Sequence, residues 1–87
     1  MTNRHTETAA HLAPIIERVH GAHHPELTRV REITEELQSS DDSTTTITLF
    51  QELRTVTENY AIPDGVCEAF EATYHALESA DKQLTAA

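Results

Sequence analysis

Apolar side chains are spaced as in an α-helix over the segment from Pro63 to Leu84. Successive positions are separated by four or three residues, which places them on one side of a helix: Val66, Phe70, Thr73, Leu77, Ala80 and Leu84, widened by Cys67 and Tyr74. The opposite side is polar and should face water. Proline suits the first turn of a helix, so we expect this helix to begin at Pro63. Because one amphipathic helix cannot bury its apolar side alone, other segments must cover it.

A shorter pattern near the N-terminus predicts another helix, whose apolar side carries Ala9, Leu12, Ile15, Ile16 and Val19. Thr6 or Thr8 offers an N-cap for this helix. Pro14 disfavours an unbroken helix by about 3 kcal/mol, so either the helix is kinked at Pro14 or its firm part begins near Ala13. Gly21 fits the left-handed residue that commonly ends a helix.

The next amphipathic segment is expected to begin at Pro25 and Glu26. Its apolar side is formed by Leu27, Val30, Ile33 and Leu37. On its polar side Arg31 and Glu35 lie four residues apart and can form an ion pair worth about 0.3–0.5 kcal/mol. Residues 38–44 are polar and rich in capping residues, so we expect a loop there.

The segment from Thr44 to Leu49 reads TTTITL, a composition typical of a strand. Its neighbours favour a helix instead, because apolar residues continue at helical spacing through Leu49, Leu53, Val56 and Tyr60, with Phe50 beside them. No second segment offers a convincing partner strand. We therefore predict a helix from about Thr45 to Tyr60.

Four helices joined by short links predict an all-α fold, an antiparallel four-helix bundle. For a chain of 87 residues we expect a single domain over residues 1–87, with residues 1–5 frayed. The chain has only two Phe, two Tyr and no Trp. Tyr60 and Tyr74 are expected at the edge of the core with their hydroxyls reaching water. Since the small core is mostly aliphatic, self-association would supplement a marginal stability.

The formal net charge of the chain is −9, which argues against binding to nucleic acid or to an anionic membrane surface. Cations and basic proteins are better partners. Lys82 is the only lysine, whereas Asp, Glu and Thr are abundant, a balance that resembles proteins of salt-loving organisms. A single cysteine excludes an internal disulfide, and neither a signal peptide nor a membrane-spanning run is apparent, so we expect a cytoplasmic location.

Two stretches resemble parts of the hemerythrin-like domains of di-iron proteins that repair iron–sulfur clusters. The sequence VHGAHHPEL at residues 19–27 is similar to the junction of that family's first two helices, and residues 53–84 are similar to its later part. The resemblance implies a helical-bundle ancestry. That family binds two irons with carboxylates and histidines, and two of its helices carry a histidine with a glutamate four residues later. In this chain QSSDDSTTT stands where the first histidine–glutamate pair would be. The last helix stops at Ala87, before the position of the second pair, so the resemblance does not imply a retained di-iron centre.

Several histidines and glutamates are nevertheless spaced for metal binding. Glu17 lies three residues before His20, the spacing used in di-metal bundles, and imidazoles at a helix end can converge on one ion. The candidate ligands for iron or zinc are Glu17, His20, His23, His24 and His75. The simpler interpretation is that these side chains lie on solvated helix faces and that the protein holds no cofactor.

Cys67 has two interpretations, a redox-sensitive thiol near a helix start or, as we favour, a small core residue. No combination of nucleophile, base and orienting group stands out, which argues against an enzyme. We therefore expect a small acidic non-catalytic protein that acts by protein–protein interaction or as a homo-oligomer, with Leu84 as a candidate contact. The alternative is a metal-binding protein linked to iron–sulfur cluster repair or to nitrosative or oxidative stress.

Overall fold

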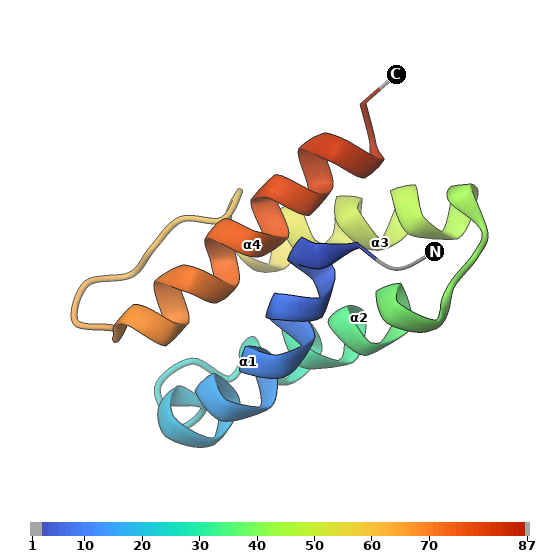
Figure 1. The fold of residues 1–87 in the computed structure, drawn as a ribbon. Helices are drawn as coiled ribbons and strands as arrows, with labels where there is room; N and C mark the ends of the chain where they lie inside the picture. Colours follow the sequence, from blue (N-terminus) through green and yellow to red (C-terminus); the bar gives the residue numbers. More distant parts are fainter. Residues whose placement is uncertain (1–2, 87) are drawn as a thin grey trace.

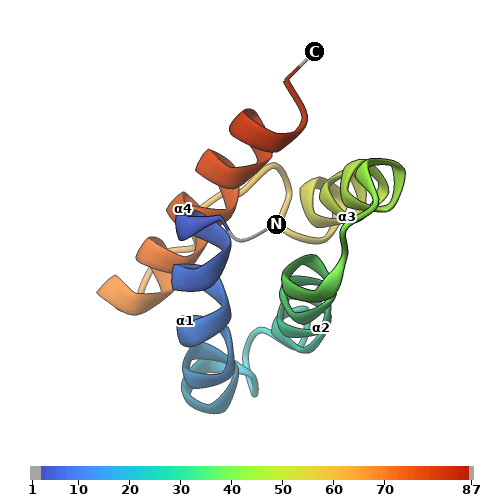
Figure 2. The ribbon, with the colours of Figure 1, turned by 45° about the vertical axis from the view of Figure 1, so that its right-hand side comes forward.

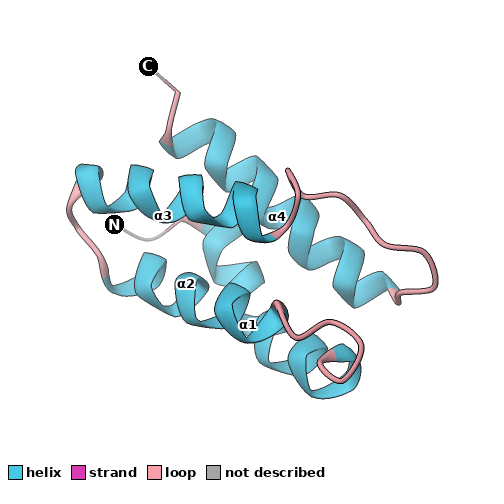
Figure 3. Ribbon diagram, turned by 180° about the vertical axis from the view of Figure 1, so that it is seen from behind, coloured by secondary structure: helices cyan, strands magenta, loops and turns pink. Residues whose placement is uncertain are grey.

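The computed structural model describes residues 3–86, which form four α-helices and no strand (Figures 1 and 3). The helices are α1 (Arg4–His20), α2 (Leu27–Ser39), α3 (Ser43–Val56) and α4 (Glu68–Leu84). α1 packs against both α2 and α4, and α2 packs against α3, whereas α3 meets α4 over a short stretch only (Figure 2). The predicted all-α four-helix architecture is confirmed.

The core is built from the apolar sides of all four helices. The side chains that the sequence assigns to α2 are all buried: Leu27, Val30, Ile33 and Leu37. α4 contributes Phe70, Thr73, Leu77 and Ala80 as expected, whereas Leu84 is 38% exposed. The largest fully buried side chains are those of Tyr74, Phe50 and Phe70.

α4 begins at Glu68 and not at Pro63, so our prediction of its start is wrong. Cys67 is the N-cap residue, with an extended backbone, and Gly65 has a φ of 78°, which a right-handed helix cannot contain. Ile62 and Val66 still pack against the core, but from the loop that precedes the helix. Val66 therefore continues the helical spacing of the sequence although it lies in the loop before α4, because this loop residue also packs against the core.

α1 begins earlier than expected, at Arg4, so the prediction that residues 1–5 are frayed is wrong for Arg4 and His5. Its N-cap is Asn3, whose Oδ1 accepts hydrogen bonds from the backbone N–H groups of His5 at 2.9 Å and Thr6 at 3.3 Å. The predicted caps Thr6 and Thr8 lie inside the helix. Residues 1 and 2 lie outside the described part of the chain.

α1 runs through Pro14 and includes the turn before it, so the helix does not begin near Ala13. Val19 is 62% exposed, contrary to its predicted place on the buried side. Gly21 is right-handed, with a φ of −59°, so the prediction of a left-handed cap is wrong. A glycine is needed here because the backbone passes close to Glu17. The N–H of Gly21 donates to the carbonyl oxygen of Glu17 at 2.8 Å, and any Cβ at this position would clash with that oxygen.

α3 confirms the helical interpretation of the TTTITL segment. Asp42 is the N-cap, and its carboxylate accepts hydrogen bonds from the N–H of Thr45 at 2.9 Å and from the Thr45 hydroxyl at 2.7 Å. The loop before it covers residues 40–42, which is shorter than the predicted 38–44. The helix ends at Val56, four residues before the predicted Tyr60. The reason is local, since Glu58, Asn59 and Tyr60 have φ values of 54°, 60° and 63°.

Three arginines tie helices that are consecutive along the chain. Arg31 of α2 pairs with Glu17 of α1 at 2.6 Å, and Arg29 of α2 pairs with Glu52 of α3 at 2.6 Å. Arg54 of α3 pairs with Asp81 of α4, with 2.7 Å between Nε and Oδ2. The predicted Arg31–Glu35 pair is also present, at 3.1 Å. Most of these pairs are partly exposed and add little to stability, whereas the carboxylate of Asp81 is buried.

Candidate functional site

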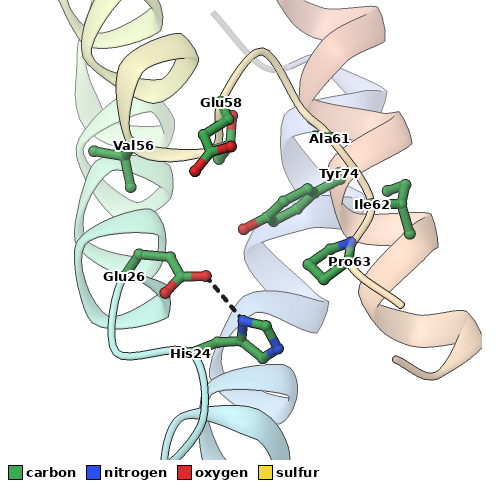
Figure 4. A pocket seen from close by; sticks show the side chains of 9 residues that line it. His24, Glu26, Val56, Glu58, Ala61, Ile62, Pro63 and Tyr74 are labelled. Carbon is green, nitrogen blue, oxygen red and sulfur yellow. Dashed lines mark hydrogen bonds and ion pairs between the residues drawn. The ribbon is translucent and has the colours of Figure 1, made fainter. Parts of the chain in front are cut away.

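A cleft of about 530 Å³ opens where the start of α2, the end of α3 and the middle of α4 meet (Figure 4). Nine residues line it: His24, Glu26, Val56, Thr57, Glu58, Ala61, Ile62, Pro63 and Tyr74. Its lining combines apolar groups with two carboxylates and one phenol, and it contains neither lysine nor arginine.

One rim of the cleft is the left-handed turn that follows α3. Each left-handed residue with a Cβ costs about 1–2 kcal/mol, so the three in succession must be held by their surroundings. The N–H of Asn59 donates to the carbonyl of Arg54 at 2.7 Å, and the N–H of Tyr60 donates to the hydroxyl oxygen of Thr57 at 2.9 Å. The turn therefore fixes the backbone from which Glu58 faces the cleft.

The turn is also anchored to α4 through the carboxylate of Asp81, a residue only 4% exposed. The Asp81 carboxylate accepts a hydrogen bond from the Tyr60 hydroxyl at 2.8 Å. The same carboxylate also accepts hydrogen bonds from Arg54 and from the hydroxyl of Thr85. Burial raises the pKa of Asp81, but the hydrogen bonds from Arg54, Tyr60 and Thr85 together outweigh it and hold that pKa below its ordinary value. We call Arg54, Tyr60, Asp81 and Thr85 the Asp81 network.

Tyr74 forms the floor of the cleft. Its side chain is 1% exposed, its ring packs on Phe70 with centroids 4.7 Å apart, and its hydroxyl points into the cleft (Figure 4). That hydroxyl forms no hydrogen bond with any of residues 3–86, and its oxygen is open to the cleft rather than sealed in the core. Burial, and to a smaller extent the negative charge of Glu26, raises the pKa of Tyr74, so the phenol stays protonated at neutral pH. A buried side chain thus presents a free polar atom to the cleft.

His24 and Glu26 form the wall opposite Pro63. The His24 Nδ1 lies 3.1 Å from one carboxylate oxygen of Glu26, Oε2, and the His24 ring packs edge-on against Phe70 at 5.4 Å. Glu26 is the N-cap residue of α2, but its side chain makes no capping hydrogen bond. The histidine therefore fixes the Glu26 carboxylate at the cleft.

These features define what the cleft can hold. Glu26, Glu58 and the Tyr74 hydroxyl face the same space from three different elements, and Val56, Ile62 and Pro63 provide an apolar lining (Figure 4). Carboxylates accept hydrogen bonds and favour positive charge, while a phenol oxygen can accept one hydrogen bond more. The arrangement suits a positively charged group that carries several donors and an apolar stem.

The predicted metal ligands are not gathered at one point. Glu17 is paired with Arg31, and His24 with Glu26. His20 lies beside His24, with ring centroids 6.5 Å apart, whereas His23 is exposed in the turn after α1 and His75 is exposed on α4. Within residues 3–86 no group of three or more His, Cys, Asp and Glu side chains is arranged to hold a metal ion.

Cys67 is exposed, so our preferred interpretation of it as a core residue is wrong. Its Sγ lies 3.1 Å from Nε2 of His20. The contact arises because the end of α1 meets the start of α4, which brings together residues 47 positions apart in sequence. His20 also packs edge-on against Phe70 at 5.5 Å, so the imidazole is held between the thiol and the core.

Sequence reasoning missed Glu26 and Glu58 as site residues and gave Tyr74 only a structural place. The expectation that the Tyr60 hydroxyl reaches water is wrong, because it bonds to Asp81. One signal was present: asparagine tolerates a left-handed backbone, so Asn59 shortly before Pro63 favours a turn over a continued helix.

Comparisons of the chain with protein-family models, with curated proteins and with solved structures found no match. Among the described residues, no helix is both long and apolar enough to cross a membrane.

Proposed function

We propose that this protein is a non-catalytic binding module whose cleft receives a positively charged segment of a partner protein. The observation that carries the proposal is the Tyr74 hydroxyl, which belongs to a buried side chain, has no hydrogen-bond partner among the described residues and points into the cleft. The oxygen is open to the cleft and is therefore free to accept a hydrogen bond from a ligand. One such hydrogen bond contributes about 0.5–1.5 kcal/mol to binding.

The charge of the cleft supports a basic partner. Glu26 and Glu58 bring two negative charges to a lining without lysine or arginine, within a chain whose net charge is −9. Such a field attracts cationic segments and repels phosphates and acidic proteins. A partner protein of basic charge fits both the cleft and the rest of the acidic surface.

The experiment is a titration followed by amide NMR. The probes are a capped hexapeptide that alternates alanine with lysine and arginine, and a peptide of equal length that carries glutamate instead. At about 0.15 M salt, where exposed charges are screened beyond about 8 Å, we expect the cationic peptide to give saturable shifts at Val56, Thr57, Ala61 and Ile62. The acidic peptide should give none.

Two double variants with the same change of charge separate the cleft from the general acidity. Glu26→Gln with Glu58→Gln should abolish the response. Glu68→Gln with Glu71→Gln, which alters exposed carboxylates on α4, should leave it intact. Equal weakening by both pairs, or shifts spread evenly over the acidic surface, would overturn the proposal.

The resemblance to hemerythrin-like domains supports a second, metal-binding function only weakly, because Glu17 and His24 already have partners. Elemental analysis of protein purified without a histidine tag tests it. Stoichiometric iron or zinc that is lost in His20→Ala would place metal binding above the present proposal.

The Cys67–His20 contact favours a reactive thiol as a further candidate, because an adjacent base can activate a cysteine. If the imidazole assists, iodoacetamide should alkylate Cys67 more slowly in His20→Gln than in the parent protein. Equal rates would leave Cys67 as an ordinary exposed thiol.

A further inference from the structure

We infer that the group bound in the cleft is the primary ammonium of a lysine side chain, and not the guanidinium of an arginine. The inference rests on the proposed function, because it specifies the chemistry of the basic segment that the cleft receives. It follows from how the acceptor atoms of the cleft are already used and from where they lie.

The first argument concerns Glu26. Arginine owes much of its advantage over lysine to two parallel hydrogen bonds with both oxygens of one carboxylate. In this cleft Oε2 of Glu26 is engaged by Nδ1 of His24 at 3.1 Å. A guanidinium that formed the paired contact would have to share Oε2 with the imidazole. An ammonium needs a single oxygen, and Oε1 of Glu26 has no partner among residues 3–86.

The second argument concerns direction. The acceptors come from three elements: Glu26 from the start of α2, Glu58 from the left-handed turn and Tyr74 from α4 (Figure 4). They surround a common space rather than lying along one line. An ammonium carries three donors that diverge from one nitrogen, whereas the five donors of a guanidinium lie in one plane. Acceptors on several sides match the ammonium.

The third argument concerns the stem. Val56, Ile62 and Pro63 line the cleft, and the side chains of Val56 and Ile62 also pack against the core, so this apolar surface is fixed. Lysine buries its methylene stem on such surfaces while its charged end keeps polar partners. An amine without a stem would leave the apolar lining unused.

The test uses three small probes: Nα-acetyl-lysine methylamide, the corresponding arginine compound, and the same lysine compound acetylated on Nε. Each is titrated against the intact protein while the amide signals of Val56, Thr57 and Ile62 are followed. We expect the lysine probe to bind about three- to tenfold more tightly than the arginine probe, the range that one hydrogen bond provides. The Nε-acetylated probe should produce no saturable shift.

Tyr74→Phe is the decisive variant, because it removes only a hydroxyl that no described residue uses. It should weaken binding of the lysine probe about two- to tenfold, while the NMR spectrum of the variant remains that of a folded protein. The Glu68→Gln and Glu71→Gln double variant should bind the probe as the parent does. Unchanged binding in Tyr74→Phe would overturn the inference.

The outcomes separate this inference from the proposed function. If the cationic hexapeptide binds in the cleft but the arginine probe binds as tightly as the lysine probe or more tightly, the choice of lysine fails and the binding module stands. If neither the hexapeptide nor any cationic probe shifts the cleft residues, the proposed function and this inference fail together.

Discussion

The two tyrosines of this protein are both buried but use their hydroxyls in opposite ways. The Tyr60 hydroxyl donates to the buried carboxylate of Asp81 at 2.8 Å, whereas that of Tyr74 points into the cleft with no partner among the described residues. Burial first, and then the hydrogen bond to Asp81, raises the pKa of Tyr60. Both phenols are therefore protonated at neutral pH, but only the Tyr60 hydroxyl forms a hydrogen bond within the fold.

This difference predicts opposite effects of the same substitution. Tyr60→Phe should lower the free energy of unfolding by about 1–3 kcal/mol, because it removes a donor from a buried charged acceptor. Tyr74→Phe should change it by about 0.5 kcal/mol or less. Urea denaturation of the two variants measures both values. Equal destabilisation would show that the Tyr74 hydroxyl does have a partner in the folded protein.

The carboxylate of Asp81 makes the free energy of unfolding depend on pH. Its pKa is lowered in the folded protein and returns to about 3.9 in the unfolded chain. The contribution of this carboxylate is therefore complete above the unfolded pKa, and it is lost as the pH falls through the lower folded pKa. Glu17, Asp42 and Glu52 also have lowered pKa values and act in the same direction.

We expect the free energy of unfolding to fall between about pH 5 and pH 3, and to fall less steeply in Asp81→Asn. That variant should also be less stable at pH 7 by about 1.5–3 kcal/mol, since it loses hydrogen bonds to a charged group. Urea denaturation across this pH range gives the slope. Asp64→Asn, a change in an exposed loop, is the control and should keep the parent slope.

At the level of elements, patterns that rest on burial were predictable and those that rest on backbone conformation were not. The apolar side of α2 is buried residue for residue, and the TTTITL segment is helical because its neighbours set the period. The end of α3 and the start of α4 were misplaced, because Tyr60 and Val66 pack apolar surface against the core from outside the helices and so imitate helical spacing.

The cleft depends on the parts that the sequence describes least well. Three successive left-handed residues, Glu58 to Tyr60, have no signal of comparable strength in composition, and the hydroxyl of Tyr60 is bound by Asp81, far along the chain. Tyr74 was correctly placed in an apolar pattern, but the direction of its hydroxyl is a property of the assembled helices. The contact between His20 and Cys67 likewise requires the packing of α1 on α4.

The start of α3 should be sensitive to its cap. Threonines at the beginning of α3 form helix poorly, so the hydrogen bonds from Thr45 to the Asp42 carboxylate matter more than usual there. Asp42→Ala should lower the free energy of unfolding by about 1 kcal/mol, and Asp42→Asn, which can still cap, should lower it less. Denaturation curves distinguish the two variants. Equal losses would indicate that charge, and not capping, is the cause.

For the whole molecule, the net charge of −9 predicts stabilisation by salt. Salt screens the repulsion among the acidic groups, while the exposed ion pairs that it also screens are worth little. We expect the melting temperature to rise as KCl is increased from about 0.05 M to about 2 M. Circular dichroism at each concentration measures this. A melting temperature that does not rise would mean that the ion pairs between helices outweigh the repulsion.

Self-association remains a prediction at this scale as well. Leu84 is 38% exposed and Ile47 is 41% exposed. With repulsion screened in high salt, we expect sedimentation velocity to detect species larger than the 9.7 kDa monomer. Leu84→Ser should reduce their population if this side chain makes the contact. A clean monomer at all micromolar concentrations would argue against an oligomer.

The packing of α1 against α4 has a consequence for how the chain matures. Helices at opposite ends of the sequence are partners, so the first three helices leave the ribosome with part of their apolar surface uncovered until α4 follows. Tyr74 arrives on that last helix. The cleft should therefore form only once α4 has been synthesised, and a chain released before that point would expose apolar surface instead.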